Sequence, residues 1–236
     1  MQALLGYARR AINEYNMIPA GAHVAVGLSG GKDSVALLCV LARLRTVLPG
    51  GFSLAAITID ARFDGGRDTD YSAMEKLCDT LSVPYIIERT DIGEIVFDVR
   101  QEKNPCSLCA RMRRGALCRA AANAGCTHLA LAHHMDDALE TFIMNLRRGQ
   151  LGCFSPVTAL EDSGITVIRP LCTAPEKAVS RAVRRGDLPV VKNPCPRDGH
   201  SERQTAKDFL RQLEHDDPGL KERMLGALRR GHLCGW

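Results

Sequence analysis

A short glycine-containing loop between an apolar strand and a helix constrains the fold more than any other feature of the sequence. Residues 23–28 alternate small and branched apolar side chains, and residues 33–47 carry apolar residues at helical spacing. The loop that joins them reads Ser29-Gly30-Gly31-Lys32-Asp33-Ser34. A strand that passes through a glycine turn into a helix is the repeating unit of parallel α/β sheets. The chain is therefore predicted to build its sheet around this unit.

The alternation of strand and helix patterns continues along the chain. Further strands are predicted at 53–60, 85–89, 128–132 and 166–169, and further helices at 2–15, 70–81, 107–124 and 136–147. Strands separated by helices form parallel sheets that are covered on both faces, with the carboxyl ends of the strands along one edge. The predicted fold class is α/β, a doubly wound and mainly parallel five-stranded sheet with helices on both faces. A ligand is expected at the carboxyl edge.

The sequence after Pro170 changes in character and becomes basic and helical, with helices predicted at 174–185 and 202–213. We divide the chain into an N-terminal helix (1–20), a nucleotide-binding domain (21–172) and a small C-terminal helical extension (173–236).

Composition excludes several classes of protein. With 45% hydrophobic and 25% charged residues, the chain fits a globular domain. No apolar run approaches the roughly 20 residues of a membrane-spanning helix, and residues 1–10 lack the pattern of a secretory signal. No membrane partner and a cytoplasmic location are therefore expected. Because the net charge is only +4, a polyanion would have to bind a local basic patch.

The glycine loop is suited to holding phosphate. Glycines let backbone N–H groups converge on an anion, and the helix that follows adds the positive end of its dipole. The loop is not a Walker A motif, because Val26 stands where that motif needs glycine and Asp33 where it needs Ser or Thr. A plain turn with a serine cap would explain Ser29 and Gly30, but not the six residues as a unit.

This hexapeptide, following a strand of small apolar residues, resembles the pyrophosphate loop of the PP-loop ATP pyrophosphatases. The resemblance implies cleavage of ATP to AMP and pyrophosphate while a carbonyl oxygen is adenylated. It implies that a magnesium ion and Lys32 offset the phosphate charge, that Asp33 is catalytic, and that Asp60 lies near the adenosine. The residues implied to surround the β- and γ-phosphates are Ser29, Gly30, Gly31, Lys32, Asp33 and Ser34.

Three of the ten cysteines form a candidate metal site. Cys106 and Cys109 make a CxxC at a proline-led helix start, and Cys195 lies in a distant Pro-Cys-Pro turn. Disulfides are not expected in a reducing compartment. A structural zinc site usually has four ligands, whereas a cubane cluster with three cysteines leaves one iron open. The sequence leaves open a CxxC redox pair, a zinc site completed by His200, and simple burial. Cys172 and Cys234 are the rivals to Cys195.

A narrower resemblance joins the loop to the cysteines. The segments 104–115, 132–137 and 168–171 follow the loop in the order found in the tRNA 2-thiocytidine synthetase group, and the similarity runs from about residue 22 to about residue 210. That group pairs a PP-loop with a [4Fe-4S] cluster bound by three cysteines, whose fourth iron carries the sulfur for an adenylated tRNA base. The resemblance implies that Cys106, Cys109 and Cys195 are the ligands. The zinc-binding CxxC pairs of related thiouridine synthetases are absent from this sequence.

Polar residues at the start of the helix at 136–147 are candidates for the same edge of the sheet. The run His133-His134-Met135-Asp136-Asp137 follows an apolar strand directly. Aspartate oxygens are suitable magnesium ligands. We therefore assign His133 and Asp136 to nucleotide binding and Asp137 to catalysis, with Glu140 in support. The alternative is that Asp136 caps the helix and both histidines are satisfied locally.

Arginines that follow the CxxC on the same predicted helix could bind phosphate. Arg111 and Arg114 share a face, and Arg113 occupies the position of the family's catalytic basic residue beside the ATP α-phosphate. A solvated helix face is the alternative. Other basic residues are candidates for a tRNA footprint. They are Arg147, Arg148, Arg181, Arg184, Arg185, Lys192, Arg197 and Arg203.

Together these features predict an ATP-dependent tRNA sulfurtransferase that adenylates a tRNA base carbonyl, at cytidine C2, and exchanges the oxygen for sulfur. The expected cofactors are ATP, Mg²⁺ and a [4Fe-4S] cluster. The expected partners are tRNA and a sulfur donor, either a cysteine desulfurase or free sulfide, with a homodimer as an open possibility. The alternatives are an amide- or lysidine-forming PP-loop ligase with a structural zinc, and a sensor that binds ATP and a cluster without turnover.

Overall fold

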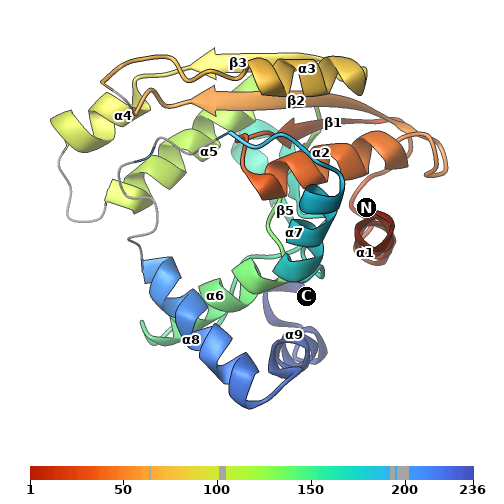
Figure 1. Ribbon diagram of the computed structural model, residues 1–236, viewed down its shortest axis with the longest axis vertical. Helices are drawn as coiled ribbons and strands as arrows, with labels where there is room; N and C mark the ends of the chain where they lie inside the picture. Colours follow the sequence, from red (N-terminus) through yellow and green to blue (C-terminus); the bar gives the residue numbers. More distant parts are fainter. Residues whose placement is uncertain (64, 101–104, 192–194, 196–201) are drawn as a thin grey trace.

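The computed structural model describes residues 1–63, 65–100, 105–191, 195 and 202–236 (Figure 1). Its centre is a single sheet with the strand order β3-β2-β1-β4-β6-β5. The strands are β1 (Ala22–Gly27), β2 (Phe52–Asp60), β3 (Tyr85–Arg89), β4 (His128–Ala130), β5 (Val157–Leu160) and β6 (Ile165–Ile168). All neighbouring pairs are parallel except β5 with β6. The chain winds outward from β1 in both directions, so a crevice is expected at the carboxyl ends of β1 and β4.

The predicted five-stranded sheet is confirmed in class but wrong in strand number. All five predicted strands are present, and a sixth, β5, forms an antiparallel hairpin with β6 at the edge of the sheet. It has only four residues, none of them buried, and it turns through the short helical turn η2 (Glu161–Ser163) and the left-handed Gly164. The sequence prediction assigned no strand to these residues, which directly precede the acidic turn η2.

Helices follow the strands in the expected order. They are α1 (Gln2–Glu14), α2 (Lys32–Leu44), α3 (Ser72–Thr80), α4 (Ile92–Glu94) with the π-helical turn η1 (Ile95–Val99), α5 (Pro105–Asn123), α6 (Met135–Leu146), α7 (Glu176–Arg185), α8 (Glu202–Asp216), α9 (Leu220–Arg230) and the short turn η3 (Leu233–Gly235). The prediction did not include α4, η1 or α9. Among the helices of the described ranges, none combines the length and apolar character needed to cross a bilayer.

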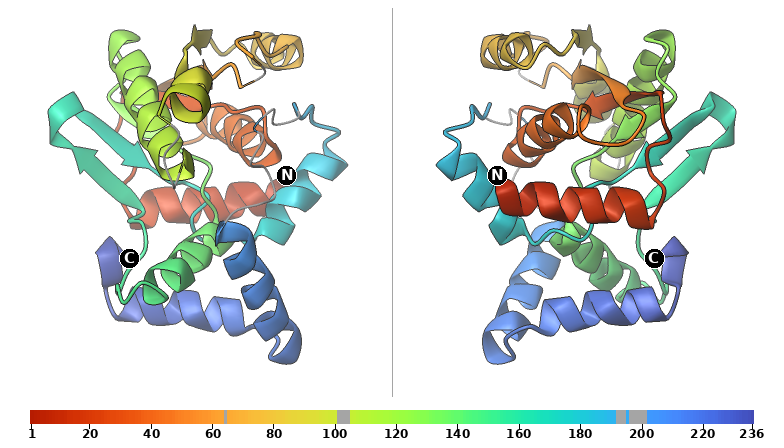
Figure 2. Two further views of the ribbon diagram at one scale, coloured as in Figure 1. Left: turned by 90° about the vertical axis from the view of Figure 1, so that its left-hand side faces the viewer. Right: turned by 90° about the vertical axis from the view of Figure 1, so that its right-hand side faces the viewer.

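The two faces of the sheet are covered by different helices, as predicted (Figure 2). Side chains alternate along β1, so Val24 and Val26 join the core under α1, α2, α3 and α7, while Ala25 joins the core under α5. Nine of the 13 residues of α2 are buried, which makes it the central helix of the first face. The phosphate loop is thus anchored at both ends by buried elements, β1 and α2.

The last two helices form a hairpin below the sheet in Figure 1, packed against α6. Leu210 of α8 and Leu225 and Leu228 of α9 join the same core as α2 and α7. The helical nature of the region after residue 173 agrees with the prediction. The boundary between residues 172 and 173 stays a prediction, and one core runs across it, since Leu171, Cys172 and Ala174 all belong to that core.

Candidate nucleotide and thiol site

The loop between β1 and α2 is held in its turn by its own serines. The Ser34 hydroxyl donates to the Gly31 carbonyl at 2.9 Å, and the Ser29 amide donates to Ser34 Oγ at 3.2 Å. Gly31 is the N-cap of α2, and no described side chain caps this helix. The first amides of α2 therefore remain available to an anion that binds at the N-terminus of the helix.

Gly30 shows why the loop needs glycine. Its φ is +80°, in the left-handed region, and a Cβ there would lie 2.9 Å from Cβ of Val191. The Val191 amide donates a 2.9 Å hydrogen bond to the Gly30 carbonyl. The segment that follows α7 therefore lies directly on the phosphate loop, four residues before Cys195 in the sequence.

A cavity of about 590 Å³ opens between this loop and α5. Its apolar lining comes from the central strands and α5, and includes Leu28, Ile57, Ile59, Leu117 and Leu131. Its polar lining consists of Ser29, Gly31, Asp33, Ser34, Ser107, Arg111, Arg113, Arg114, His133 and Asp137. An apolar slot beside backbone amides, arginines and carboxylates has the surfaces that a flat aromatic base and a charged phosphate chain require.

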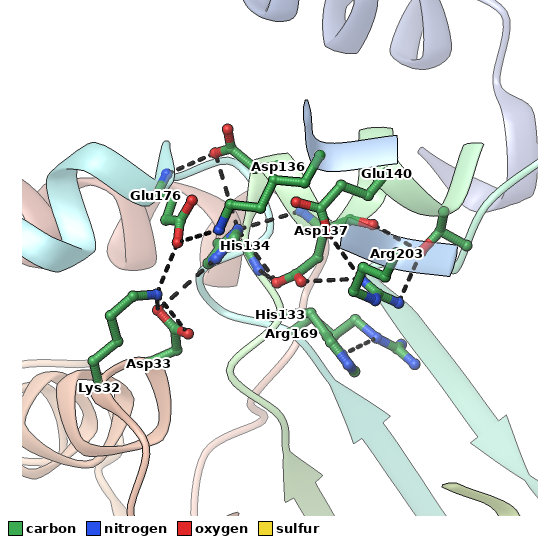
Figure 3. Close-up of polar contacts among 12 residues, drawn as sticks. Lys32, Asp33, His133, His134, Asp136, Asp137, Glu140, Arg169, Glu176 and Arg203 are labelled. Carbon is green, nitrogen blue, oxygen red and sulfur yellow. Dashed lines mark hydrogen bonds and ion pairs between the residues drawn. The ribbon is translucent and has the colours of Figure 1, made fainter. Parts of the chain in front are cut away.

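Lys32 does not line the cavity, because two carboxylates hold its ammonium group (Figure 3). Nζ lies 2.8 Å from Asp33 Oδ1 and 3.0 Å from Glu176 Oε1, and Glu176 also binds Lys207 of α8 at 2.8 Å. Burial acts to raise the pKa of Glu176, but hydrogen bonds from Lys207 and Lys32 outweigh it and lower the pKa to about 2. The lysine is thus fixed at the edge of the site.

Asp60 is 1% exposed at the end of β2, and its carboxylate holds the loop that follows. Its oxygens accept from the amides of Arg62 (3.1 Å) and Thr69 (2.9 Å) and from the Thr69 hydroxyl (3.2 Å). Asp60 is not among the residues that line the cavity. Its role near adenosine stays a prediction, and these hydrogen bonds give it a structural one.

The two aspartates at the start of α6 point in different directions. His134 is the N-cap, and it exchanges hydrogen bonds with Asp137, whose carboxylate accepts from the His134 amide at 2.9 Å. Asp137 lines the cavity, whereas Asp136 accepts from the Glu176 amide (2.6 Å) and pairs with Lys221 of α9 at 2.8 Å. Of the two magnesium candidates, only Asp137 faces the cavity, and the helix cap is His134, not Asp136.

Beside Asp137, the His133 ring lines the cavity and receives a 3.2 Å hydrogen bond from Nε of Arg169. Burial is the main cause that lowers the pKa of His133, to about 4. The charge of Asp137 acts to raise this pKa, and the charges of Arg169 and Arg203 act with burial to lower it. His133 is therefore neutral at physiological pH.

The CxxC lies at the start of α5, the helix that forms the opposite wall, although neither of its cysteines is among the residues that line the cavity. Cys106 is exposed and Cys109 is buried, both in the first turns of α5, whose Ser107, Ala110 and Arg113 line the cavity. Burial raises the pKa of the Cys109 thiol, Arg113 lowers it, and the neighbouring Cys195 and Cys106 raise it further. Cys195 is therefore within electrostatic reach of the Cys109 thiol, although it is far away in the sequence.

The described residues contain no group of three His, Cys, Asp or Glu side chains drawn together at metal-ligand geometry. Cys195 is the one described residue between positions 192 and 201. His200, the candidate fourth zinc ligand, lies outside the described residues. The same holds for Asn104 of the family motif and for the footprint residues Lys192 and Arg197.

The rival cysteines lie elsewhere. Cys172 is fully buried in the main core, and burial raises its pKa to about 12. The Cys234 sulfur accepts a hydrogen bond from the Cys153 amide at 3.4 Å, in the turn before β5. Neither sulfur adjoins α5 in the structure, so Cys195 remains the proposed third ligand.

Several site residues were missed in the sequence or assigned to another role. Glu176, Lys207 and Lys221 carry no motif, and only the fold brings them to the phosphate loop and α6. Arg203 was assigned to the tRNA footprint, but it binds Asp137 Oδ1 at 3.1 Å and Glu140 Oε2 at 3.2 Å. Burial, and then the charge of Asp137, raises the pKa of Glu140. For Arg169, the run Ile168-Arg169-Pro170 of the family motif was the available signal.

Comparison with known proteins agrees with this geometry. A family profile described as the PP-loop domain matches residues 7–213. The chain is 39% identical over 228 residues to the tRNA-cytidine(32) 2-sulfurtransferase of Citrifermentans bemidjiense, covering 94% of this chain and 88% of that protein. The chain belongs to the PP-loop family of tRNA-cytidine(32) 2-sulfurtransferases. Another relative in this family, from Polaromonas naphthalenivorans, is 38% identical and is covered to 70% of its length.

A solved structure extends the similarity of this PP-loop family member to three dimensions. The U34-tRNA thiolase NcsA from Methanococcus maripaludis, solved with its [4Fe-4S] cluster, superposes with a TM-score of 0.77 at 27% identity. The match covers 95% of this chain and 77% of that chain. The doubly wound fold is therefore that of the thiolase, including the region after residue 173.

Proposed function

We propose that the protein is an ATP-dependent tRNA sulfurtransferase that adenylates the C2 carbonyl oxygen of a tRNA cytidine and replaces this oxygen with sulfur. The observation that carries the proposal is that one cavity has the phosphate loop on one wall and the CxxC helix on the other. A site that only cleaved ATP would not need a CxxC on the helix that lines it. The names of the relatives support the same reaction class and the same base.

The residues of the loop would bind the triphosphate. The free amides at the start of α2 and the Ser29 and Ser34 hydroxyls suit the β- and γ-phosphates, and Arg113 suits the α-phosphate. Asp33 and Asp137 both line the cavity and would hold Mg²⁺. The base oxygen then attacks the α-phosphorus and pyrophosphate leaves. A sulfur nucleophile next attacks the activated carbon, the C–O bond breaks, and AMP leaves with the oxygen.

Cys106, Cys109 and Cys195 would hold a [4Fe-4S] cluster. The donor set is chemically suitable, because three cysteines are present and the charges of Cys106 and Cys195 act on Cys109, although their sulfurs are not drawn together at ligand geometry in the described residues. Burial raises the pKa of Cys109, and the hydrogen bond from Arg113 acts in the opposite direction, toward the thiolate. A cluster bound by three cysteines supplies an iron with one open position for the sulfur atom. Arg113 thereby links the thiol wall to the phosphate end of the cavity.

Further parts of the proposal concern partners. The tRNA substrate follows from the relatives' reaction, and the sulfur donor, a cysteine desulfurase or free sulfide, must reach the thiol wall. We place the protein in the cytoplasm, where tRNA is found and thiolates persist. A homodimer is a separate proposal, which analytical ultracentrifugation of the purified protein tests.

The proposal is tested by complementation. The chain is expressed in a bacterial strain that lacks 2-thiocytidine in its tRNA, and the nucleosides are measured by mass spectrometry. Return of 2-thiocytidine is expected, and an unchanged profile would contradict the proposed reaction. Anaerobic purification should yield iron and sulfide, and pyrophosphate release should require tRNA. One zinc and no iron would favour the amide or lysidine ligase, whereas ATP binding without turnover would favour the sensor.

A further inference from the structure

We propose that His133 acts in the reaction as a neutral hydrogen-bond donor, presenting Nε2–H to an anionic oxygen of the bound nucleotide, and that Arg169 is its positioning residue. The role in the reaction depends on the proposed function, because it requires ATP in the cavity. The protonation state of the ring does not depend on it, and can be measured on the protein alone.

The contact between the two side chains determines where the histidine proton lies (Figure 3). Arg169 Nε is 3.2 Å from His133 Nδ1. A guanidinium group can only donate hydrogen bonds, so Nδ1 must accept and therefore carries no proton. In the neutral ring the single proton is then on Nε2. Within the described parts of the chain, Nε2 forms no hydrogen bond, and His133 lines the cavity.

Arg169 is itself held in place from several sides. Its Nη1 donates to the Ser155 carbonyl at 2.6 Å and to the Thr158 hydroxyl at 3.2 Å. Its guanidinium lies 5.0 Å from the centre of the Phe154 ring, and the His133 ring lies 4.9 Å from the same centre at an angle of 32°. Phe154 thus supports both members of the pair, and neither ring nor guanidinium is free to rotate.

The charge of Arg169 has no carboxylate partner among the described residues, although the side chain is only 6% exposed. A buried cation without an anion is unfavourable for folding, so its presence needs another explanation. Here the cation lies behind an imidazole whose opposite edge faces the cavity. It keeps the ring neutral and draws electron density toward Nδ1, which makes Nε2–H a stronger donor.

A strengthened neutral donor suits a site in which negative charge builds up on oxygen. The charged groups around the ring are Asp137 and His134 of α6, Arg169 of the β6 end and Arg203 of α8. Donors that are already in place where charge develops stabilise a transition state without reorganisation. A histidine held in this way cannot serve as a general base or bind a metal through Nδ1, because that nitrogen is occupied.

The first test needs no variant. The full-length protein, purified anaerobically with its metal site loaded, is labelled with ¹⁵N-histidine, and long-range ¹H–¹⁵N spectra are recorded between pH 5.5 and 8.5. The expected result is a His133 ring that stays neutral with its proton on Nε2 throughout this range. A ring protonated on Nδ1, or one that titrates near its ordinary pKa, would overturn the proposal.

The second test separates donation from packing. His133→Phe keeps an aromatic ring against Phe154 but removes the hydrogen-bond donor. It is expected to lower the rate of tRNA-dependent pyrophosphate release by about 10²-fold, which is the typical effect of losing one preorganised donor. His133→Gln restores a neutral N–H donor and should recover at least about ten-fold of this loss. Equal loss in both variants, with both folded by circular dichroism, would contradict the donor role.

The positioning role of Arg169 has its own variant and control. Arg169→Gln is expected to lower kcat by about ten-fold with little change in KM for ATP, and to let His133 titrate in the ¹⁵N spectra. Thr158→Val removes a different contact of Arg169. This variant should keep kcat within about two-fold of wild type, and its His133 ring should stay neutral in the ¹⁵N spectra. If the His133 ring is neutral with its proton on Nε2 but the protein does not thiolate tRNA, the result contradicts the proposed function and leaves the proposed state of the histidine intact.

Discussion

Cys195 and Cys172 differ in the property that a metal ligand needs, which is access to other thiols. The Cys195 thiol interacts with Cys109, whereas Cys172 is fully buried in the main core. We expect Cys195→Ser to lose most of its iron and sulfide after anaerobic purification. Cys172→Ala should keep both, at a cost of about 1 kcal/mol in unfolding free energy. If Cys172→Ala loses iron and Cys195→Ser does not, then Cys195 is not the third ligand.

Glu176 holds two lysines, Lys32 and Lys207, that would otherwise repel each other. Its folded-state pKa of about 2 lies below the ordinary 4.5, so the ionised form is stabilised by folding. This stability is complete above pH 4.5 and is lost as the pH falls toward 2. Allowing for screening by solvent, Glu176→Gln should lower the unfolding free energy by about 2 kcal/mol at pH 7, and the difference should shrink below pH 4.5.

Urea unfolding at pH 7 and at pH 3.5 measures this difference. Glu222→Gln is the matched control. Among the described residues, the exposed Glu222 forms an ion pair with Lys177 alone, at 3.8 Å, so this substitution should change stability by less than about 0.5 kcal/mol. An equal effect of the Glu176 substitution at both pH values would show that its ion pairs are not the source of stability.

At the level of single residues, the sequence could indicate which side chains suit the chemistry but not which way each side chain points. It assigned Asp136 to nucleotide binding and Asp137 to catalysis, and it offered either as a magnesium ligand, since both follow a strand and begin a helix. Successive helix residues point about 100° apart, so the two carboxylates need not share a direction, and in the structure Asp137 lines the cavity whereas Asp136 does not. Which one does so depends on where α7 and α9 pack, and the sequence contains no local signal for that.

Among the elements, the phosphate loop and the segment after α7 depend on each other through Gly30 and Val191. Gly30→Ala adds a methyl group at a left-handed position, which costs about 1–2 kcal/mol, and it displaces Val191. We expect at least about ten-fold weaker ATP binding by calorimetry. Val191→Ala alone should have a small effect, and combining the two should not restore binding, because the backbone strain remains. Restored binding would show that the contact alone requires glycine.

The elements that the sequence predicted are those whose apolar pattern repeats over a long stretch. Five strands and α2 could be predicted because each lies in a run of apolar residues beside turn signals, although in β3 none of the residues is buried. The helix α4, with three residues, is too short for such a pattern. The predicted helices ended at residue 213 and did not include α9, although two of its residues, Leu225 and Leu228, are buried, as many as in the predicted helices α3 and α8.

Across the whole molecule, the basic residues divide into two groups that the sequence could not separate. Arg203 is occupied by Asp137 and Glu140, whereas Arg184 and Arg185 are exposed at the end of α7. The exposed pair is available to tRNA phosphates. Replacing both with alanine should weaken tRNA binding and reduce the slope of log Kd against log salt by about two, roughly one for each phosphate contact.

Fluorescence anisotropy with labelled tRNA at several salt concentrations measures this slope. Arg203→Ala is the contrasting variant, since its loss should disturb ATP binding at Asp137 and leave the salt slope unchanged. A changed slope for Arg203→Ala, together with an unchanged slope for the Arg184 and Arg185 variant, would move the footprint from α7 to α8.

If Cys195 is a metal ligand, as we propose, the hydrogen bond from Val191 to Gly30 would link nucleotide occupancy to metal loading. A shift of the loop on binding ATP would act on Val191, which precedes Cys195 by four residues in the sequence. Linkage of this kind is reciprocal. If ATP slows the release of iron to a chelator, the loaded protein must bind ATP more tightly than the metal-free protein, by the same factor at equilibrium. Incomplete loading would then appear in an assay as a defect in substrate affinity.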